Sequence, residues 1–326
     1  PTEPTPTPQP PPPPFAYAGR FDTHAFGNAA GRRNYKLYQP PRTDDRAQPV
    51  VVMLHGCTQS PDDFALGTQM NRLADAHGFL VVYPEQPAQA NPSKCWNWFQ
   101  PQDQVRDAGE PSIIAGIVRE VADRHGADLQ QVFVAGLSAG AAMAVVMGES
   151  YPEVFAGVGA HSGLPYAAAH DIPSALSVMK HGRSGLAALR GLAAPPSPVQ
   201  AAHAVPLIVF HGDRDHTVQH DNATALVAQA AHAHRARLGP DALTARTQVG
   251  RAGSGRGYSR TVHADADGHT RIEAWTLHGA GHAWSGGDPR GSFTDASGPD
   301  ASAEMVRFFL SLTPAATSVQ TPAAGP

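Results

Sequence analysis

The sequence predicts an α/β fold in which a mainly parallel sheet is covered by helices on both faces. Three observations predict it. Short apolar runs typical of buried strands alternate with longer segments that have apolar residues at helical spacing. A Gly-x-Ser-x-Gly motif joins one of these strands to a helix, and Asp-rich and His-rich segments follow two later strands.

The first half of the chain supplies two strands and two helices before the serine motif. Apolar residues predict buried strands at 49–54 and 79–83. The pair Ser60-Pro61 is typical of a capping residue before proline at the first helical position, so we expect a helix that runs toward Ala76. A second helix is predicted over 112–125, where isoleucine and valine recur at helical spacing.

The motif Gly136-Leu137-Ser138-Ala139-Gly140 is the most informative part of the sequence. It follows the apolar run 132–135 and opens onto the helix-forming run 141–147. Such a motif turns the chain from strand to helix so sharply that its serine adopts a strained backbone, which only small neighbours permit. Ser138 is therefore predicted to be a nucleophile at the carboxyl edge of the sheet. A serine that only caps a helix would share this local pattern.

Two later strands end in the residue types that would complete a catalytic triad. A turn with Asp215 follows the strand at 206–210, and a glycine-rich loop with His282 follows the strand at 272–277. The order Ser, Asp, His is that of the α/β-hydrolase fold, and the other serine hydrolase folds have different orders. We therefore expect an α/β-hydrolase fold.

Each residue of the predicted triad answers a chemical need. A serine hydroxyl is a weak nucleophile, so His282 would accept its proton and return it to the leaving alcohol. A buried carboxylate, assigned to Asp215, would hold the imidazole in one tautomer and stabilise the imidazolium. Asp213 is the competing acid, although its place nearer the strand end favours a turn-capping role. The alternative for His282 is a loop histidine that faces solvent.

The tetrahedral intermediate of acyl transfer needs preorganised hydrogen-bond donors for its oxyanion. One is predicted to be the N–H of Ala139, the residue after the nucleophile. The other should come from the loop after the strand 49–54, where the Cys57 N–H is the candidate and the Thr58 N–H the reserve. Histidines at the other strand ends, His55, His161 and His211, are interpreted as core residues. No metal-binding pattern occurs, so we expect neither metal nor cofactor.

Six short motifs occur in a fixed order along the chain. They are Leu54-His55-Gly56-Cys57-Thr58-Gln59, Tyr83-Pro84-Glu85-Gln86, Cys95-Trp96-Asn97-Trp98-Phe99, Gly109-Glu110-Pro111, Ala135-Gly136-Leu137-Ser138-Ala139-Gly140 and Gly279-Ala280-Gly281-His282-Ala283-Trp284. Together, across about residues 30–312, they resemble the polyhydroxybutyrate (PHB) depolymerase family of esterases. The resemblance supports the triad and implies secreted, extracellular or periplasmic, hydrolysis of hydroxyalkanoate or related aliphatic polyesters. Feruloyl and acetylxylan esterases of plant cell wall are similar in two of these motifs and remain the alternative.

The resemblance also implies that Cys57 and Cys95 form a disulfide bond, for which two free buried thiols are the alternative. The bond would tie the oxyanion loop to the aromatic loop that follows Cys95 and would fit an exported protein. Trp96, Trp98 and Trp284 fall in loops expected beside the triad, where flat apolar rings suit ester chains or sugar rings. We predict that they bind substrate, with core packing as the alternative.

The later elements and the chain ends complete the predicted organisation. We expect a helix at 222–238, a hairpin split at Asp267-Gly268 and a closing helix at 300–312, with a mobile loop at 250–257. The segment 165–206 is predicted to be either a lid insertion or ordinary surface helices.

A single catalytic domain is predicted over 15–312, between two tails. The chain has 326 residues, 41% of them hydrophobic and 16% charged, which suffices for one large core. The proline-rich segment 1–14 and the segment 313–326 are predicted to be disordered tails or linkers. Either they once joined the domain to a polymer-binding module that was lost, or they are tails without a role.

Composition also limits the partners. A net charge of -4 without a basic run gives no reason to expect nucleic acid or anionic membrane as a partner. No apolar stretch reaches the roughly 20 residues that span a bilayer. The expected partner is a polyester or a small ester. A non-catalytic binding protein on the same fold is the remote alternative, against which the intact Ser, Asp and His set argues.

Overall fold

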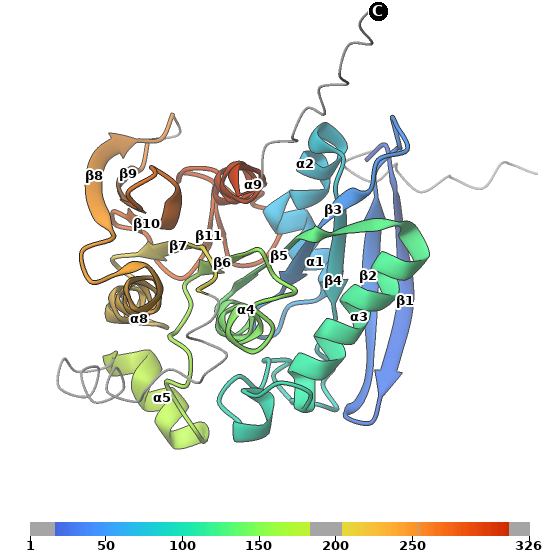
Figure 1. The fold of residues 1–326 in the computed structure, drawn as a ribbon. Coiled ribbons are helices and arrows are strands. Elements are labelled where there is room, and N and C mark those ends of the chain that lie inside the picture. The colour runs from blue at the N-terminus through green and yellow to red at the C-terminus, as the bar shows by residue number, and fades with distance from the viewer. Residues whose placement is uncertain (1–16, 183–203, 254, 313–326) are drawn as a thin grey trace, which may run out of the picture.

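The computed structural model describes residues 17–182, 204–253 and 255–312 (Figure 1). The predicted tails at 1–14 and 313–326 therefore lie outside the described residues. The same holds for 183–203, the larger part of the predicted lid segment.

A sheet of ten strands forms the centre of the described protein, in the order β1-β2-β4-β3-β5-β6-β7-β10-β9-β8. The strands are β1 (Arg20–Asn28), β2 (Gly31–Gln39), β3 (Gln48–Leu54), β4 (Leu80–Pro84), β5 (Ala127–Leu137), β6 (Gly157–His161), β7 (Leu207–Gly212), β8 (Thr244–Arg251), β9 (Gly257–Ala264) and β10 (Thr270–Leu277). Strands from β4 through β10 in this order run parallel, and the pairs at both edges run antiparallel. The predicted α/β fold with a mainly parallel sheet is confirmed.

Helices cover both faces of the sheet (Figure 1). One face packs against α3 (Gly109–His125), α4 (Ala139–Ser150) and α8 (Asp221–Leu238), and the other against α1 (Pro61–Thr68), α2 (Met70–His77) and α9 (Ala301–Ser311). Successive strand residues point to opposite faces, so Val52 joins the first apolar cluster and Met53 the second. This burial on both sides explains why the central strands read as continuous apolar runs.

The remaining elements are short or lie at the margin of the sheet. They are the 3₁₀ helix η1 (Pro101–Asp103), α5 (Ile172–His181) and the small parallel pair β11 (Trp284–Ser285) and β12 (Thr294–Asp295). The helix α5 lies at the bottom of the view in Figure 1, below α8, whose Asn222 Nδ2 donates to the Val178 carbonyl of α5 at 2.9 Å.

Three local predictions need correction. The helix that begins at Ser60 does not run unbroken toward Ala76, because Gln69 adopts a left-handed conformation (φ 55°) that ends α1 and starts α2. The long helix predicted over 112–125 begins earlier, at Gly109. The loop predicted over 250–257 is shorter, because β8 continues to Arg251 and β9 begins at Gly257. The hairpin at Asp267-Gly268 is confirmed by the antiparallel pairing of β9 with β10.

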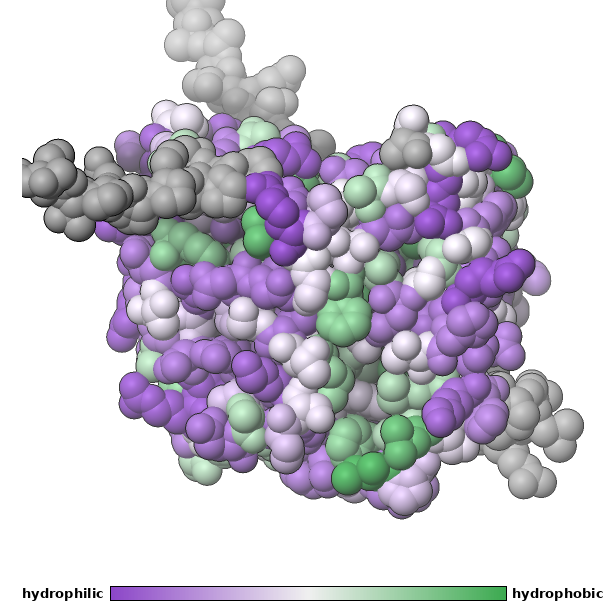
Figure 2. Space-filling model, turned by 180° about the vertical axis from the view of Figure 1, so that it is seen from behind, coloured by the Kyte–Doolittle hydropathy of each residue, from purple (hydrophilic) through white to green (hydrophobic). Residues whose placement is uncertain are grey.

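No membrane-spanning helix is found in the part of the chain that the structure describes. None of its helices combines the length and apolar character needed to cross a bilayer. Figure 2 shows the molecule from behind: this face is mostly hydrophilic, and its hydrophobic residues gather near the centre and toward the lower edge.

Candidate active site

Ser138 lies in a sharp turn between β5 and α4, with φ of 58° and ψ of -120°. These angles are unfavourable for a residue that has a Cβ, and such strain is found mainly at functional sites. The Ser138 N–H donates to the His161 carbonyl at 2.9 Å, and the Ser138 carbonyl accepts from the Ala142 N–H at 3.0 Å. The turn has the strained geometry that the Gly-x-Ser-x-Gly motif predicts.

Two glycines of the motif permit backbone-to-backbone packing around this turn. A Cβ on Gly140 would lie 2.0 Å from the Leu54 carbonyl oxygen, and one on Gly136 would lie 2.4 Å from the Gly140 carbonyl group. Any side chain at these positions would therefore push α4 away from β3 and β5. The close approach brings Ser138 next to the end of β3, where the loop with Cys57 begins.

The order of the sheet brings the three predicted triad residues to one edge. Ser138 follows β5, Asp215 follows β7 and His282 follows β10. β5, β6, β7 and β10 are successive neighbours and run parallel, so their carboxyl ends meet at the same edge. Neighbouring strands lie about 4.8 Å apart, so residues distant in sequence project from positions a few strand widths apart.

His282 and Asp215 form a hydrogen-bonded pair at this edge. Nδ1 of His282 lies 2.7 Å from Oδ2 of Asp215, whose side chain is fully buried. The other carboxylate oxygen, Oδ1, accepts from the N–H groups of Thr217 at 2.9 Å and Val218 at 2.8 Å. Because Nδ1 faces a fixed carboxylate, this nitrogen carries the ring proton and Nε2 is free to accept another.

The environment of Asp215 favours its ionised form. Burial raises the pKa of Asp215, but the hydrogen bond and charge of His282 and the N–H of Val218 lower it more, so the pKa lies below its usual value. Asp213 has a different partner: its Oδ1 accepts from the Gly279 N–H at 2.7 Å and thereby ties the turn after β7 to the loop after β10. The carboxylate that contacts His282 is therefore that of Asp215.

The loop after β3 carries the predicted oxyanion donors. Cys57 is bonded to Cys95, which confirms the predicted disulfide. The Thr58 N–H donates to the Ser93 carbonyl at 2.7 Å, so the reserve donor already has an acceptor. For the Cys57 N–H no acceptor is found among the residues that the structure describes. The N–H of Ala139, the first residue of α4, belongs to the group that lacks an acceptor within its own helix.

A cavity of about 370 Å³ opens beside Ser138. Cys57 and Ala139 also line it, together with the apolar side chains of Trp98, Phe99, Leu164, Ile172, Ala175, Leu176 and Met179. Small-molecule sites have volumes of roughly 300 to 1,000 Å³ and mainly apolar walls, and this cavity fits both criteria. Ile172 and Leu176 on α5 are 58% and 53% exposed, so the apolar surface continues outward from the cavity.

Only one of the three tryptophans that were predicted to bind substrate lines this cavity, namely Trp98. Trp96 is completely buried, with its ring 5.8 Å from that of His55. Trp284 is 1% exposed, stacks on His161 and donates its indole N–H to the Ser302 hydroxyl at 3.1 Å. Their burial leaves no ring face for a ligand, so Trp96 and Trp284 are core residues, the alternative that the sequence left open.

Sequence reasoning missed Phe293, and it named no residue of α5, although this helix lies in the segment 165–206 that was predicted to be a lid insertion or surface helices. The ring of Phe293 lies edge-on to that of His282, with centroids 6.4 Å apart, and the side chain is 45% exposed. It lies in an irregular loop before β12, where no periodicity could have identified it. The signal for α5 was its place inside the segment 165–206, which follows the strand after the serine motif.

Three other histidines at strand ends are buried, as predicted: His55, His161 and His211. Burial lowers the pKa of His161 to about 3, and that of His55 and His211 to about 4. They are therefore neutral near pH 7 and act as hydrogen-bonding parts of the scaffold. His161 Nε2 accepts from the Ser285 N–H at 3.0 Å, and His211 Nε2 donates to the Val218 carbonyl at 2.8 Å.

One group of side chains within the described ranges could bring three ligand atoms together, namely Asp265, Asp267 and His269 in the turn between β9 and β10. Asp265 is already engaged: Arg271 donates to it at 2.7 and 2.8 Å, and the N–H groups of Asp267 and His269 donate to it at 3.1 and 2.9 Å. These contacts explain the cluster as part of a turn, and it lies apart from the cavity beside Ser138.

Comparison with known proteins identifies one family. The model of the family described as Esterase PHB depolymerase matches residues 33–256. The chain is 36% identical over 235 residues to poly(3-hydroxyalkanoate) depolymerase C of Paucimonas lemoignei, covering 72% of this chain and 54% of that protein. It is also 36% identical over 119 residues to feruloyl esterase B of Neurospora crassa, covering 36% of this chain and 40% of that protein. The chain thus spans about half the length, or less, of these curated relatives.

Among solved structures, the fold is similar to that of an acetyl xylan esterase from Aspergillus awamori. The TM-score is 0.66 at 19% identity, and the alignment covers 89% of this chain and 99% of the other. An S-formylglutathione hydrolase from Agrobacterium tumefaciens aligns with a TM-score of 0.54 at 14% identity, covering 92% and 98% of the two chains. Both likenesses support the α/β-hydrolase fold.

Proposed function

Because this chain belongs to the PHB depolymerase family of esterases, we propose that it hydrolyses carboxylic esters through Ser138, His282 and Asp215. The observation that carries the proposal is the His282–Asp215 pair, with 2.7 Å between Nδ1 and Oδ2, at the sheet edge that also bears the strained Ser138. The three residue types, their order along the chain and their common place at one sheet edge are those of a serine hydrolase.

The proposed reaction has two steps that share one base. Ser138 Oγ attacks the ester carbonyl carbon while Nε2 of His282 takes its proton, and the Cys57 and Ala139 N–H groups stabilise the oxyanion. The imidazolium, stabilised by Asp215, then protonates the leaving alcohol and an acyl-enzyme remains. Water, deprotonated by the same histidine, hydrolyses the acyl-enzyme and frees Ser138.

For the substrate, we propose an ester of an aliphatic hydroxyacid, either short or as part of a polyester. The cavity beside Ser138 has mainly apolar walls, which favour an aliphatic chain over a charged one. The exposed side chains of Ile172 and Leu176 extend this surface beyond the cavity, so a chain longer than the cavity would stay in contact with apolar groups. The matched relative that is a poly(3-hydroxyalkanoate) depolymerase points to the same chemistry.

A feruloyl or acetylxylan esterase is the second candidate. It is favoured by the similarity to feruloyl esterase B. Such a substrate would place an aromatic acyl group or a small acetyl group in the cavity and a sugar at its mouth. Asn91 and Ser93 supply polar groups on the cavity wall that a sugar hydroxyl could contact.

We also propose that the protein is exported and that its catalytic domain covers 15–312. A disulfide bond between Cys57 and Cys95 persists in oxidising compartments and is rare in the cytosol. Ten of the strands described in this region form one sheet, with an apolar cluster on each face.

The test compares the wild type with Ser138→Ala and with Ser150→Ala on p-nitrophenyl butyrate. Ser150 is the matched control: it is as buried as Ser138, at 7% exposure, but lies at the other end of α4. Ser138→Ala should lower kcat by about 10⁴-fold or more, while Ser150→Ala should keep most of the activity. Equal rates for the wild type and Ser138→Ala would instead favour a non-catalytic binding protein.

The substrate class needs a separate experiment. We expect the wild type to release hydroxyacids from an amorphous PHB suspension faster than it cleaves methyl ferulate or acetylated xylan at matched ester concentration. Faster cleavage of either plant-derived ester would transfer the proposal to the second candidate.

A further inference from the structure

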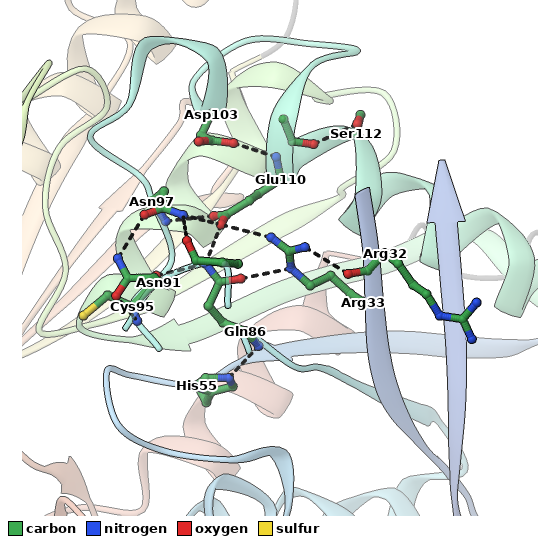
Figure 3. Close-up of polar contacts among 12 residues, drawn as sticks. Arg32, Arg33, His55, Gln86, Asn91, Cys95, Asn97, Asp103, Glu110 and Ser112 are labelled. Atoms are coloured by element: carbon green, nitrogen blue, oxygen red, sulfur yellow. Dashed lines mark hydrogen bonds and ion pairs between the residues drawn. The ribbon is translucent and has the colours of Figure 1, made fainter. Parts of the chain in front are cut away.

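Three of the six sequence motifs, those that contain Gln86, Asn97 and Glu110, contribute no group to the proposed chemistry and meet in one buried network around Glu110 (Figure 3). Glu110 lies in the first turn of α3 and is 3% exposed. Its carboxylate accepts a hydrogen bond from Gln86 Nε2. It also accepts from two groups of Asn97, the N–H and Nδ2, both at 2.8 Å, and from Arg33 Nη2 at 3.4 Å. A single side chain thus joins β2, both ends of the long loop between β4 and η1, which includes Cys95, and α3.

The donors around Glu110 are themselves held in fixed orientations. Arg33 Nε donates to Gln86 Oε1 at 3.0 Å, which turns the Gln86 amide nitrogen toward Glu110 and the Cys95 carbonyl, also 3.0 Å away. Asp103 Oδ1 accepts from the Glu110 N–H at 2.7 Å. Because every hydrogen-bond partner of the carboxylate among the described residues is an N–H donor, an amide in its place would set at least one N–H against another.

A first route leads from Glu110 to the oxyanion loop through Gln86 and His55. The Gln86 N–H donates to Nε2 of His55 at 3.0 Å, so the ring proton is on Nδ1, which donates to the Gly56 carbonyl at 2.8 Å. The Gly56 carbonyl and the Cys57 N–H belong to one planar trans peptide and point in opposite directions. Holding the carbonyl therefore sets the direction of the Cys57 N–H.

A second route passes through the loop that carries Cys95. Asn97, bonded to Glu110 by its backbone and side chain, accepts from Asn91 Nδ2 at 3.0 Å. Asn91 in turn accepts from the Cys95 N–H at 3.3 Å, and Cys95 is bonded to Cys57. Both routes that begin at the Glu110 carboxylate end at the same peptide group, the predicted oxyanion donor.

We propose that Glu110 is a positioning residue for ester hydrolysis: its carboxylate holds the two loops that aim the Cys57 N–H at the oxyanion. The inference rests on the proposed function. A donor fixed before the reaction stabilises the transition state without reorganisation, so its orientation affects kcat more than substrate binding. Burying an ion pair costs desolvation free energy, and such pairs are weak contributors to stability. A role in orientation accounts for a buried carboxylate at this place.

The test compares Glu110→Gln with Glu273→Gln, a control of the same kind. Glu273 on β10 is also buried and accepts from Arg260 Nε at 2.8 Å, Arg260 Nη2 at 2.9 Å and Trp275 Nε1 at 2.8 Å. No contact links it to the loop with Cys57 within the described residues. Both variants replace a buried carboxylate by an amide, so both should lose stability, but only one acts on the oxyanion loop.

Three quantities are measured: kcat, KM, and the affinity for a boronic acid that forms a tetrahedral adduct with the nucleophile. Glu110→Gln should lower kcat by about tenfold or more and change KM by less than about twofold. It should also lower the affinity for the boronic acid by about the same factor as it lowers kcat. Glu273→Gln should leave all three within about twofold. Unchanged kcat in folded Glu110→Gln, or equal losses in both variants, would overturn the proposal.

Two further measurements cover the other outcomes. If Glu110→Gln does not fold, Asn97→Ala removes one of the donors to Glu110 and should lower kcat severalfold at constant KM, and no change would count against the proposal. If the wild type shows no esterase activity, the proposed function fails by itself. The positioning role is then tested by the rate at which dithiothreitol reduces the native Cys57–Cys95 bond. This rate should rise in Glu110→Gln and not in Glu273→Gln, and equal rates would refute it.

Discussion

Removal of the Cys57–Cys95 disulfide should cost both stability and catalytic rate. The two cysteines are 38 residues apart in sequence. In the chain-entropy model, closing a loop of this length lowers the entropy of the unfolded state by about 13 cal/mol/K, which corresponds to about 4 kcal/mol at 25 °C. Native domains have a free energy of unfolding of about 5 to 15 kcal/mol. The double variant Cys57→Ala/Cys95→Ala should therefore still fold, but with a much smaller free energy of unfolding.

The effect on rate should be smaller than the loss of a whole oxyanion donor. Such a loss costs about 3 to 4 kcal/mol of transition-state stabilisation. Two contacts remain without the disulfide, namely the Thr58 N–H to the Ser93 carbonyl and His55 Nδ1 to the Gly56 carbonyl. The loop is therefore loosened and not released, and we expect kcat to fall by about tenfold.

Urea unfolding followed by tryptophan fluorescence measures the stability term, since Trp96 and Trp98 lie beside Cys95 in the chain. The unfolding slope should increase in the variant, because the unfolded chain without the cross-link is more expanded. The single variant Cys57→Ala serves as the control, because it breaks the same bond and should lose the same stability. A loss below about 1 kcal/mol with unchanged kcat would refute the reasoning, because the bond would then constrain neither the unfolded chain nor the loop.

Three further predictions concern the site and its scaffold. Asp215→Asn should lower kcat by about 10⁴-fold and Asp213→Asn by less than about tenfold in an ester hydrolysis assay, and the reverse order would identify the other acid. Gly140→Ala should yield little soluble protein, because its Cβ would lie 2.0 Å from a carbonyl oxygen, and a soluble yield equal to the wild type would contradict this contact. The three buried strand-end histidines, whose pKa values burial lowers to about 3 or 4, bind protons only when unfolded, so stability should fall as pH drops below 6.5. At pH 5 the loss relative to pH 7 should be about 2 kcal/mol per histidine in urea unfolding, and constant stability would show that these rings are already charged or solvated.

The sequence predicted those features that local patterns determine. Strand and helix runs, the turn at Ser138 and the order Ser, Asp, His follow from short-range sterics and from the requirement that parallel strands share one edge. The break at Gln69 was not predictable, because a left-handed residue other than glycine or asparagine leaves no signature in sequence. The edge strand β1 was also missed, since its residues are mostly exposed or half-buried and show no apolar run.

The directions of loop side chains were the second feature that could not be predicted from the sequence. Trp96 and Trp98 are two residues apart in the same loop, yet the first is enclosed and the second lines the cavity. Sequence alone does not say which face of a loop meets the sheet, because loop backbone lacks the fixed periodicity of helices and strands. The same reason hid Phe293 beside His282, and it left the partners of Glu110 unknown although the motifs that contain Gln86 and Asn97 were recognised.

The histidines show how burial and partners divide one residue type between structural and chemical roles. The sequence contains 17 histidines, and at four strand ends the residue type alone does not identify the base. A general base must become charged during each turnover, and full burial disfavours the charged ring, as the lowered pKa values of His55 and His161 indicate. His282 differs in both respects, because its side chain is 12% exposed and its Nδ1 faces the buried carboxylate of Asp215. The buried histidines can therefore hold the loops in place, while the one beside both water and a carboxylate can exchange a proton.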